Sequence, residues 1–127
     1  MPPITDMEDK RYHYKAVLRS NYDGDSCRLD LDLGMGVVLK GKDGKGEECR
    51  LSRIDTPELR GDEREAGLLA KHYLADRLKD RKLMVRTFLD DEGKYGRLLV
   101  TIYIQEDDGT WTDINQELLD KGHAILY

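Results

Sequence analysis

The sequence is poor in the residues that cross-link small domains and in the apolar runs that cross membranes. Its 127 residues include only two cysteines, three prolines, one tryptophan and one phenylalanine. Cys27 and Cys49 are too few for a disulfide framework, and they form no Cys-x-x-Cys pair of the kind that binds zinc. No run approaches the roughly 18 apolar residues that span a bilayer, and the polar, acidic N-terminus has no apolar signal core. These absences predict a single globular domain that has no membrane partner.

An excess of basic charge is also missing. The chain has 21 lysines and arginines against 26 aspartates and glutamates, a formal net charge of −5. Proteins that bind nucleic acids generally carry a basic face or a high pI, so composition by itself argues against that class of partner. What the chain has in abundance is charge of both signs, at 37% of its residues, beside 39% hydrophobic residues that suffice for a core.

The apolar periodicity predicts a mainly β (α+β) fold, a five-stranded barrel with two helices packed outside it. Strands are expected at residues 12–21, 26–33, 48–54, 82–89 and 97–104. Helices are expected at residues 62–79, where apolar residues 66, 69, 70, 73, 74 and 78 recur at helical spacing, and at residues 113–121. Asp62 is the expected N-cap of the first helix. Residues 1–11 are expected to form a flexible tail and residues 12–127 the domain.

The first of three polar motifs, Asp-Gly-Asp-Ser, occupies residues 23–26 between the first two expected strands. Its simplest interpretation is a turn, because Asp-Gly is a strong turn signal. An EF-hand calcium loop does not fit, because its fifth and sixth positions would be Cys27 and Arg28, where Asp or Asn and then Gly are required.

The second motif, Arg-Leu-Ser-Arg-Ile-Asp-Thr-Pro-Glu, begins with Arg50 on an expected strand. Asp55 falls where that strand ends, and Pro57 disfavours helical backbone at Thr56. The resulting turn can direct the carboxylates of Asp55 and Glu58 and a backbone carbonyl toward one point. Hard cations such as Ca²⁺ bind this mixture of oxygens. A surface ion pair between an arginine and an acid is the alternative interpretation.

The third motif, Lys94-Tyr95-Gly96-Arg97, precedes the last expected long strand. Arg97 at the strand entrance can hold a phosphate through its forked donors. Tyr95 can supply a hydroxyl group or a flat face to a nucleotide. An ordinary basic turn is the alternative interpretation.

Taken together and in this order, the three motifs resemble the staphylococcal nuclease (thermonuclease) family, over residues 12–127. The resemblance implies an oligonucleotide-binding (OB) fold, here with five strands and two helices and with the family's third, C-terminal helix expected to be absent. It also implies that Asp25, Asp55 and the backbone carbonyl of Thr56 bind Ca²⁺ as cofactor.

The same resemblance implies three catalytic residues and three that bind substrate. Glu58 matches the carboxylate that positions or deprotonates the attacking water, and Arg50 and Arg97 match the arginines that bind phosphate. The residues expected to contact the nucleotide are Lys94, Tyr95 and the stacking residue Tyr127.

The implied activity is that of a calcium-dependent endonuclease, a hydrolase that cleaves DNA and/or RNA with little sequence specificity, since its named groups contact phosphate rather than base edges. The protein is expected to act as a monomer, in the cytoplasm, on a phage or mobile element, or as a trimmed secreted protein. Two alternatives stay open: a catalytically silent module of the same family that binds nucleic acid or a protein partner, and an unrelated acidic barrel that binds a protein.

Overall fold

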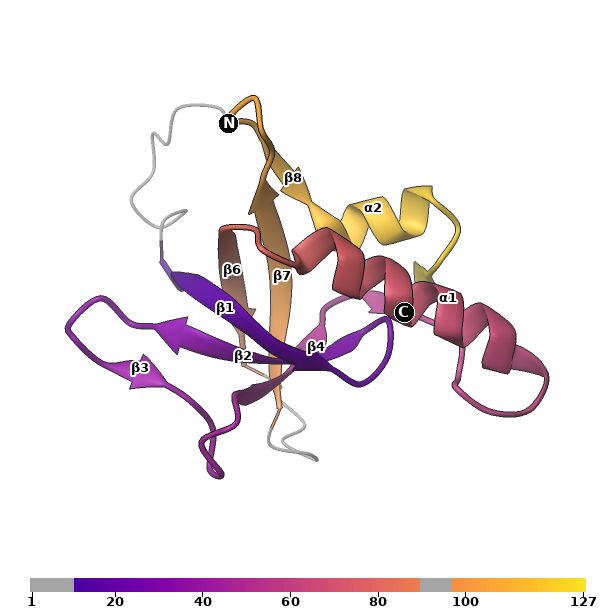
Figure 1. Ribbon diagram of the computed structural model, residues 1–127, viewed down its shortest axis with the longest axis horizontal. Helices are drawn as coiled ribbons and strands as arrows, with labels where there is room; N and C mark the ends of the chain where they lie inside the picture. Colours follow the sequence, from indigo (N-terminus) through magenta and orange to yellow (C-terminus); the bar gives the residue numbers. More distant parts are fainter. Residues whose placement is uncertain (1–10, 90–96) are drawn as a thin grey trace.

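Five long strands of the computed structural model, which describes residues 11–89 and 97–127, close into a barrel (Figure 1). They pair in the order β1-β6-β7-β4-β2, and β2 pairs with β1 to complete the circle. Only β4 and β7 run parallel; the other barrel pairs are antiparallel. The strands are β1 (His13–Asn21), β2 (Ser26–Asp32), β4 (Glu47–Leu51), β6 (Leu83–Phe88) and β7 (Leu98–Gln105). The predicted five-stranded OB-fold barrel is confirmed.

Short elements and two α-helices complete the described chain. Helix α1 (Arg64–Leu78) follows a 3₁₀ turn, η2 (Gly61–Glu63), and α2 (Ile114–Asp120) lies beside it (Figure 1). The remaining strands are β3 (Val38–Leu39), β5 (Ile54–Asp55), β8 (Trp111–Asp113) and β9 (Ile125–Leu126). No helix in the described ranges has the length and apolar character needed to cross a membrane.

The structure corrects the sequence-based prediction at two element boundaries. The strand expected at residues 48–54 is divided into β4 and β5, because Arg53 adopts a left-handed backbone with φ of 65°. Asp62 is not a helix cap: it lies inside η2, and the N-cap of α1 is Glu63, whose side chain makes no capping bond. Asp113 does cap α2, accepting a hydrogen bond from the backbone N–H of Gln116 at 3.0 Å.

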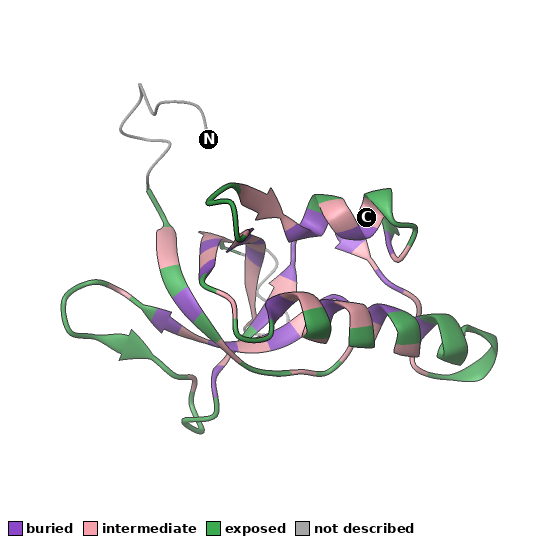
Figure 2. Ribbon diagram, turned by 45° about the horizontal axis from the view of Figure 1, so that its top comes forward, coloured by how far each residue is buried: buried purple, intermediate pink, exposed green. Residues whose placement is uncertain are grey.

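The core lies inside the barrel and under the two helices (Figure 2). Each long strand contributes alternate apolar side chains, as Leu29 and Leu31 of β2 and Ile102 and Ile104 of β7 illustrate. The buried face of α1 is narrower than predicted, because Leu69 remains 60% exposed. Such burial supplies most of the driving force for folding, at roughly 25 cal/mol per Å² of apolar surface.

One buried polar side chain connects the second helix to the barrel. The amide of Asn115 donates to the carbonyls of Ser52 and Val100 at 3.1 and 3.0 Å, and its oxygen accepts from the N–H of Ile102 at 3.1 Å. Each bond contributes about 1 kcal/mol, and an unpaired buried amide would cost more. Asn115 thereby fixes the chain just after β4, where the candidate site begins.

The two cysteines are free thiols. Cys27 and Cys49 face each other as partners in the β2–β4 pairing, and both are buried. Burial raises the pKa of the Cys49 thiol to about 12, so it stays uncharged at neutral pH. They act as small apolar residues in the barrel wall.

Candidate active site

The turn between β1 and β2 is joined to the chain after β5 through Asp25. The backbone N–H of Thr56 donates to Asp25 Oδ2 at 3.0 Å, and Asp25 is buried. Gly24 permits this approach, because a Cβ added there would lie 2.7 Å from the Cβ of Ala70 and 2.9 Å from the Cγ2 of Thr56. Within the turn, the N–H of Asp25 donates to Asp23 Oδ1 at 3.0 Å. These contacts place one predicted calcium ligand against the second polar motif.

Arg50 of β4 brings the two predicted calcium-binding carboxylates together. Its Nη1 donates to the carbonyls of Leu51 and Ile54, each at 3.0 Å, which fixes the plane of the guanidinium. Its Nη2 then lies 3.5 Å from Asp25 Oδ2 and 3.5 Å from Asp55 Oδ1. Contacts of this length are weaker than close hydrogen-bonded ion pairs, so Nη2 retains capacity for another anion.

The bend at Arg53 and the last residues of the chain complete the surroundings of Arg50. The bend lets β5 pair with β9, with Ile54 opposite Leu126. The N–H of Tyr127 donates to the carbonyl of Arg53 at 3.0 Å, and the Tyr127 ring lies 5.0 Å from the Arg50 guanidinium carbon. Tyr127 is 84% exposed, so a flat ring beside Arg50 faces solvent.

Glu58 is exposed, and its charge is one of the causes that raise the pKa of Asp55. Its backbone carbonyl is in such close contact with Gly67 of α1 that an added Cβ would lie 2.3 Å from the carbonyl oxygen. The glycine thus allows the helix to support the segment that carries Glu58.

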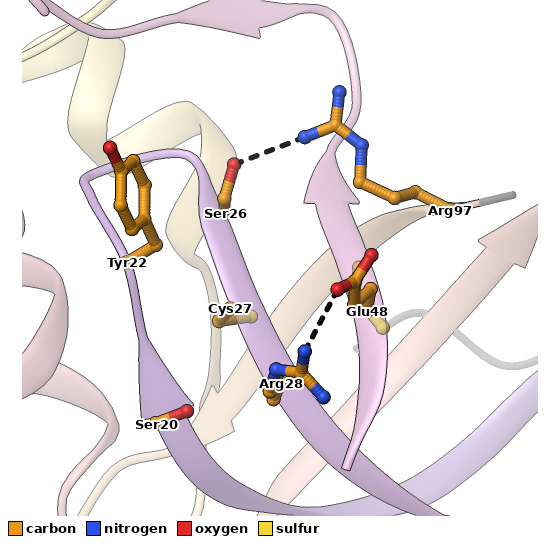
Figure 3. Close-up of a pocket in the computed structure, with 8 residues that line it drawn as sticks. Ser20, Tyr22, Ser26, Cys27, Arg28, Glu48 and Arg97 are labelled. Carbon is orange, nitrogen blue, oxygen red and sulfur yellow. Dashed lines mark hydrogen bonds and ion pairs between the residues drawn. The ribbon is translucent and has the colours of Figure 1, made fainter. Parts of the chain in front are cut away.

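Arg97 reaches the site from the start of β7. Its Nη1 lies 3.5 Å from Ser26 Oγ, and that hydroxyl lies 3.3 Å from Asp25 Oδ1 (Figure 3). Arg50 therefore contacts Asp25 directly, whereas Arg97 is connected to Asp25 through the Ser26 hydroxyl. Two predicted substrate residues, Lys94 and Tyr95, lie outside the described residues.

The crowding of carboxylates shifts their pKa values in different directions. Burial and the neighbouring Asp25 carboxylate raise the pKa of Asp23 to about 6. Burial also opposes ionisation of Asp25, but contact with the Asp23 carboxyl, the N–H of Thr56 and the charge of Arg50 together lower its pKa. The pKa of Asp55 is raised by partial burial and by the charge of Asp25. Such a set of competing acids favours a counter-cation.

The donor atoms at this site suit a hard cation. The ligands expected from the sequence are all oxygens: the carboxylates of Asp25 and Asp55, which both lie 3.5 Å from Arg50 Nη2, and the backbone carbonyl of Thr56. By distance and angle, the buried Thr56 hydroxyl has no hydrogen-bond partner among the described residues, so a polar ligand or its hydration shell could satisfy it. Within the described ranges, no three His, Cys, Asp or Glu side chains are grouped to hold a metal by themselves. A bound cation would therefore need backbone and water oxygens as well.

The fold and this cluster define a class of protein: a small OB-type barrel that gathers two arginines and several carboxylates at one end. Residues 48–127 match the family model for staphylococcal nuclease homologues. That match spans more than half of the chain, so the protein belongs to this family. Among curated protein sequences, none matches the chain. The matched segment includes Arg50, Asp55, Glu58 and Arg97; Asp25 precedes it and is brought to it by the fold.

Proposed function

We propose that this protein is a calcium-dependent endonuclease that hydrolyses phosphodiester bonds of DNA and/or RNA with little sequence specificity. The observation that carries the proposal is the position of Arg50 Nη2, 3.5 Å from both Asp25 and Asp55. The donor proposed to bind phosphate and the two acids proposed to bind the cation thereby lie close together. Membership of the staphylococcal nuclease homologue family supports a nucleic-acid substrate.

In this proposal, Asp25, Asp55 and the carbonyl of Thr56 would hold Ca²⁺. The ion would supply positive charge to a phosphate oxygen and so favour the more highly charged transition state. Burial of Asp25 and its bond from Thr56 fix one ligand in place, whereas the side chain of Asp55 is 45% exposed and can adjust.

The protein's own side chains would bind the phosphate and move the proton. Arg50 and Arg97 donate to the non-bridging oxygens, whose charge grows as the nucleophile adds. Glu58 is exposed and would accept a proton from the attacking water. Tyr127 offers its ring to the adjacent nucleotide, and Lys94 and Tyr95 are proposed to line the nucleotide pocket. These groups contact phosphate and base faces, which accounts for the expected weak sequence preference.

The direct test compares Glu58→Gln with the parent chain on plasmid and on single-stranded DNA and RNA. Turnover should fall by about 10²- to 10⁴-fold, the usual contribution of a general base. Because Glu58 is exposed, the thermal unfolding midpoint should hardly change. Glu65→Gln, which alters an exposed glutamate in the first turn of α1, is the matched control and should retain full activity.

Calcium dependence is tested in the same assay. A chelator should abolish turnover and added Ca²⁺ should restore it. Undiminished hydrolysis in chelator would refute the calcium assignment. Binding of nucleic acid without hydrolysis under any of these conditions would favour the catalytically silent module instead.

A further inference from the structure

Strand β3 lies at a free edge of the sheet, away from the candidate active site. It is last in the strand order, and β2 is its single partner among the strands that the structure describes. The hairpin that carries β3 extends beyond the barrel (Figure 1). This strand pairs with the Asp32 end of β2, whereas the proposed Ca²⁺ site adjoins the Ser26 end, roughly 20 Å away along β2. The proposed nuclease chemistry therefore makes no use of this edge.

The free edge is apolar and lacks the features that usually keep strand edges from associating. Residues 35–39 read Met-Gly-Val-Val-Leu, without a charge or a proline. Their four apolar side chains are all between 38% and 82% exposed (Figure 2): Met35, Val37, Val38 and Leu39. Proteins usually protect an exposed edge with charged side chains, prolines or bulges. A run of exposed apolar residues on an unprotected edge is typical of an interaction site.

The backbone bonding of the hairpin leaves Val38 open to a second strand. The N–H of Leu33 donates to the carbonyl of Val37 at 2.9 Å, and the next pair along the hairpin is Asp32 with Val38. Hydrogen-bonded and non-hydrogen-bonded pairs alternate between antiparallel strands. Because Leu33 and Val37 form a hydrogen-bonded pair, the N–H and the carbonyl of Val38 point away from β2. One donor and one acceptor are therefore presented side by side at the free edge.

We infer that β3 is a dimer interface, at which its free edge pairs antiparallel with the same edge of a second copy of this chain. A two-fold axis between the two Val38 residues lets each donate its N–H to the carbonyl of the other. The same register places Val37 of each copy opposite Leu39 of the other. Three apolar cross-strand pairs then form and no charges are opposed. A symmetric contact requires a self-complementary segment, and residues 37–39 provide one.

The charges that flank the apolar segment agree with antiparallel pairing. Lys40 follows the segment, and in the antiparallel dimer the two copies of this lysine lie at opposite ends of it, roughly 14 Å apart along the strands. That separation exceeds the Debye length of about 8 Å at physiological ionic strength, so their repulsion is screened. The open edge ends at Lys40, whose carbonyl accepts from the N–H of Gly46 at 2.8 Å. The paired segment is therefore short, and we expect a weak dimer that depends on protein concentration.

The test measures the mass of the chain in solution by sedimentation equilibrium, without nucleic acid, from about 10 µM to about 1 mM, a range that covers weak association. Val38→Pro removes the N–H at the proposed two-fold axis. A proline is tolerated at a strand edge where the N–H faces solvent, so the fold should be kept. Val37→Lys places a charge against Leu39 of the second copy. Val17→Lys is the matched control, because it alters an exposed valine of β1, which pairs with both β2 and β6.

The mass of the parent and of Val17→Lys should rise with concentration toward that of two chains, whereas Val38→Pro and Val37→Lys should keep the mass of one chain. A cross-link tests the register independently. In Val38→Cys the two Cα atoms would lie about 5.5 Å apart, which suits a disulfide, so mild oxidation should give a covalent dimer. Val17→Cys should give none, and both native cysteines are buried.

Three results would overturn the inference. They are a parent that stays a single chain over the whole range, as the monomer expected from the sequence would, a dimer that persists in folded Val38→Pro, and a mass that grows beyond two chains. The last would indicate a head-to-tail contact that does not close. If circular dichroism shows that Val38→Pro is unfolded, Val37→Lys and Val38→Cys decide the question. Turnover per chain should be the same in all folded variants, because the edge lies away from the candidate active site, so the proposed function is tested separately.

Discussion

Arg50 and Arg77 each contact two carboxylates, yet the two arginines are held very differently. Arg77 of α1 contacts Glu117 at 2.7 and 3.0 Å and Glu106 at 2.6 Å. The hydroxyl of Tyr73 adds a bond to Glu117 at 2.9 Å. The carboxylate contacts of Arg50 are both 3.5 Å, and its short bonds go to backbone carbonyls instead.

The difference separates an ion pair that holds the fold from one that is open to a ligand. Arg77 uses its donors to tie α1 to α2 and to the end of β7, and the hydrogen bonds that it donates to Glu117 and Glu106 raise its pKa. Arg50 has its orientation fixed by carbonyls, so its second nitrogen and the two acids are not committed to each other. Pairing of opposite charges is therefore no guide to function unless the lengths of the contacts are considered.

Substitution of each arginine by alanine should distinguish the two roles, and it is expected to have the largest effect. Arg50→Ala should lower turnover about 10²- to 10³-fold, because a donor to the developing phosphate charge is lost. Arg77→Ala should lower the free energy of unfolding by about 2 kcal/mol, because three charged hydrogen bonds are lost, while turnover at a permissive temperature is retained. Urea denaturation and initial rates on single-stranded DNA measure both effects. Equal loss of activity in the two folded variants would contradict the distinction.

The sequence predicted the members of the Arg50 cluster but not the geometry that joins them. The barrel followed from alternation in strands such as β2, and the turn of residues 23–26 and the acids near Thr56 were expected to carry related chemistry. The left-handed backbone of Arg53 could not be predicted, because non-glycine residues rarely adopt it and no local pattern marks it.

Close contacts between segments that are distant in the chain could not be predicted from the sequence either. Gly24 was interpreted as a turn residue, whereas the structure shows that its missing side chain makes room for Ala70 and Thr56. The cap of α1 was misplaced because Asp62 precedes an apolar helical pattern, yet a 3₁₀ turn intervenes.

A second substitution, Gly67→Ala, tests whether helix α1 supports the segment that carries Glu58. In Gly67→Ala the new Cβ would meet the Glu58 carbonyl oxygen at 2.3 Å, so the segment or the helix must move. We expect a loss of about 1.5 kcal/mol in unfolding free energy, despite the better helix propensity of alanine, and a clear drop in turnover.

The neighbouring exchange Ala66→Gly provides the control for Gly67→Ala. It should cost about 1 kcal/mol through helix propensity alone, because Ala66 is exposed, and should leave turnover unchanged. If both variants lose stability and both keep full activity, α1 does not position Glu58. The activity of the Arg50 site would then not depend on the packing of α1 against the Glu58 segment.

The smallest expected effect is on the pH dependence of the unfolding free energy, measured without calcium. The contributions of Asp23, beside Asp25, and of Glu106, beside Arg77, should depend on pH with opposite signs. The pKa of Asp23 is raised to about 6 in the folded protein, so the folded state binds more protons than the unfolded state between about pH 4 and 6. The contribution of Asp23 to stability is therefore present at acidic pH and is lost as the pH rises through 6. Relative to the parent, Asp23→Asn should gain about 1 kcal/mol across this window, a value reduced for partial exposure.

Glu106 beside Arg77 should behave in the reverse way. The hydrogen bond from Arg77 lowers the pKa of Glu106, so its contribution to stability is present above the ordinary glutamate pKa and is lost as the pH falls through the lowered value. Glu106→Gln should therefore be most destabilised relative to the parent near neutral pH and should approach it in acid. Urea denaturation of both variants at pH 4 and pH 7, and of Glu106→Gln also in more acidic buffer below its lowered pKa, gives the comparison. Parallel shifts of the same sign would show that the pKa of Asp23 is not raised in the folded protein.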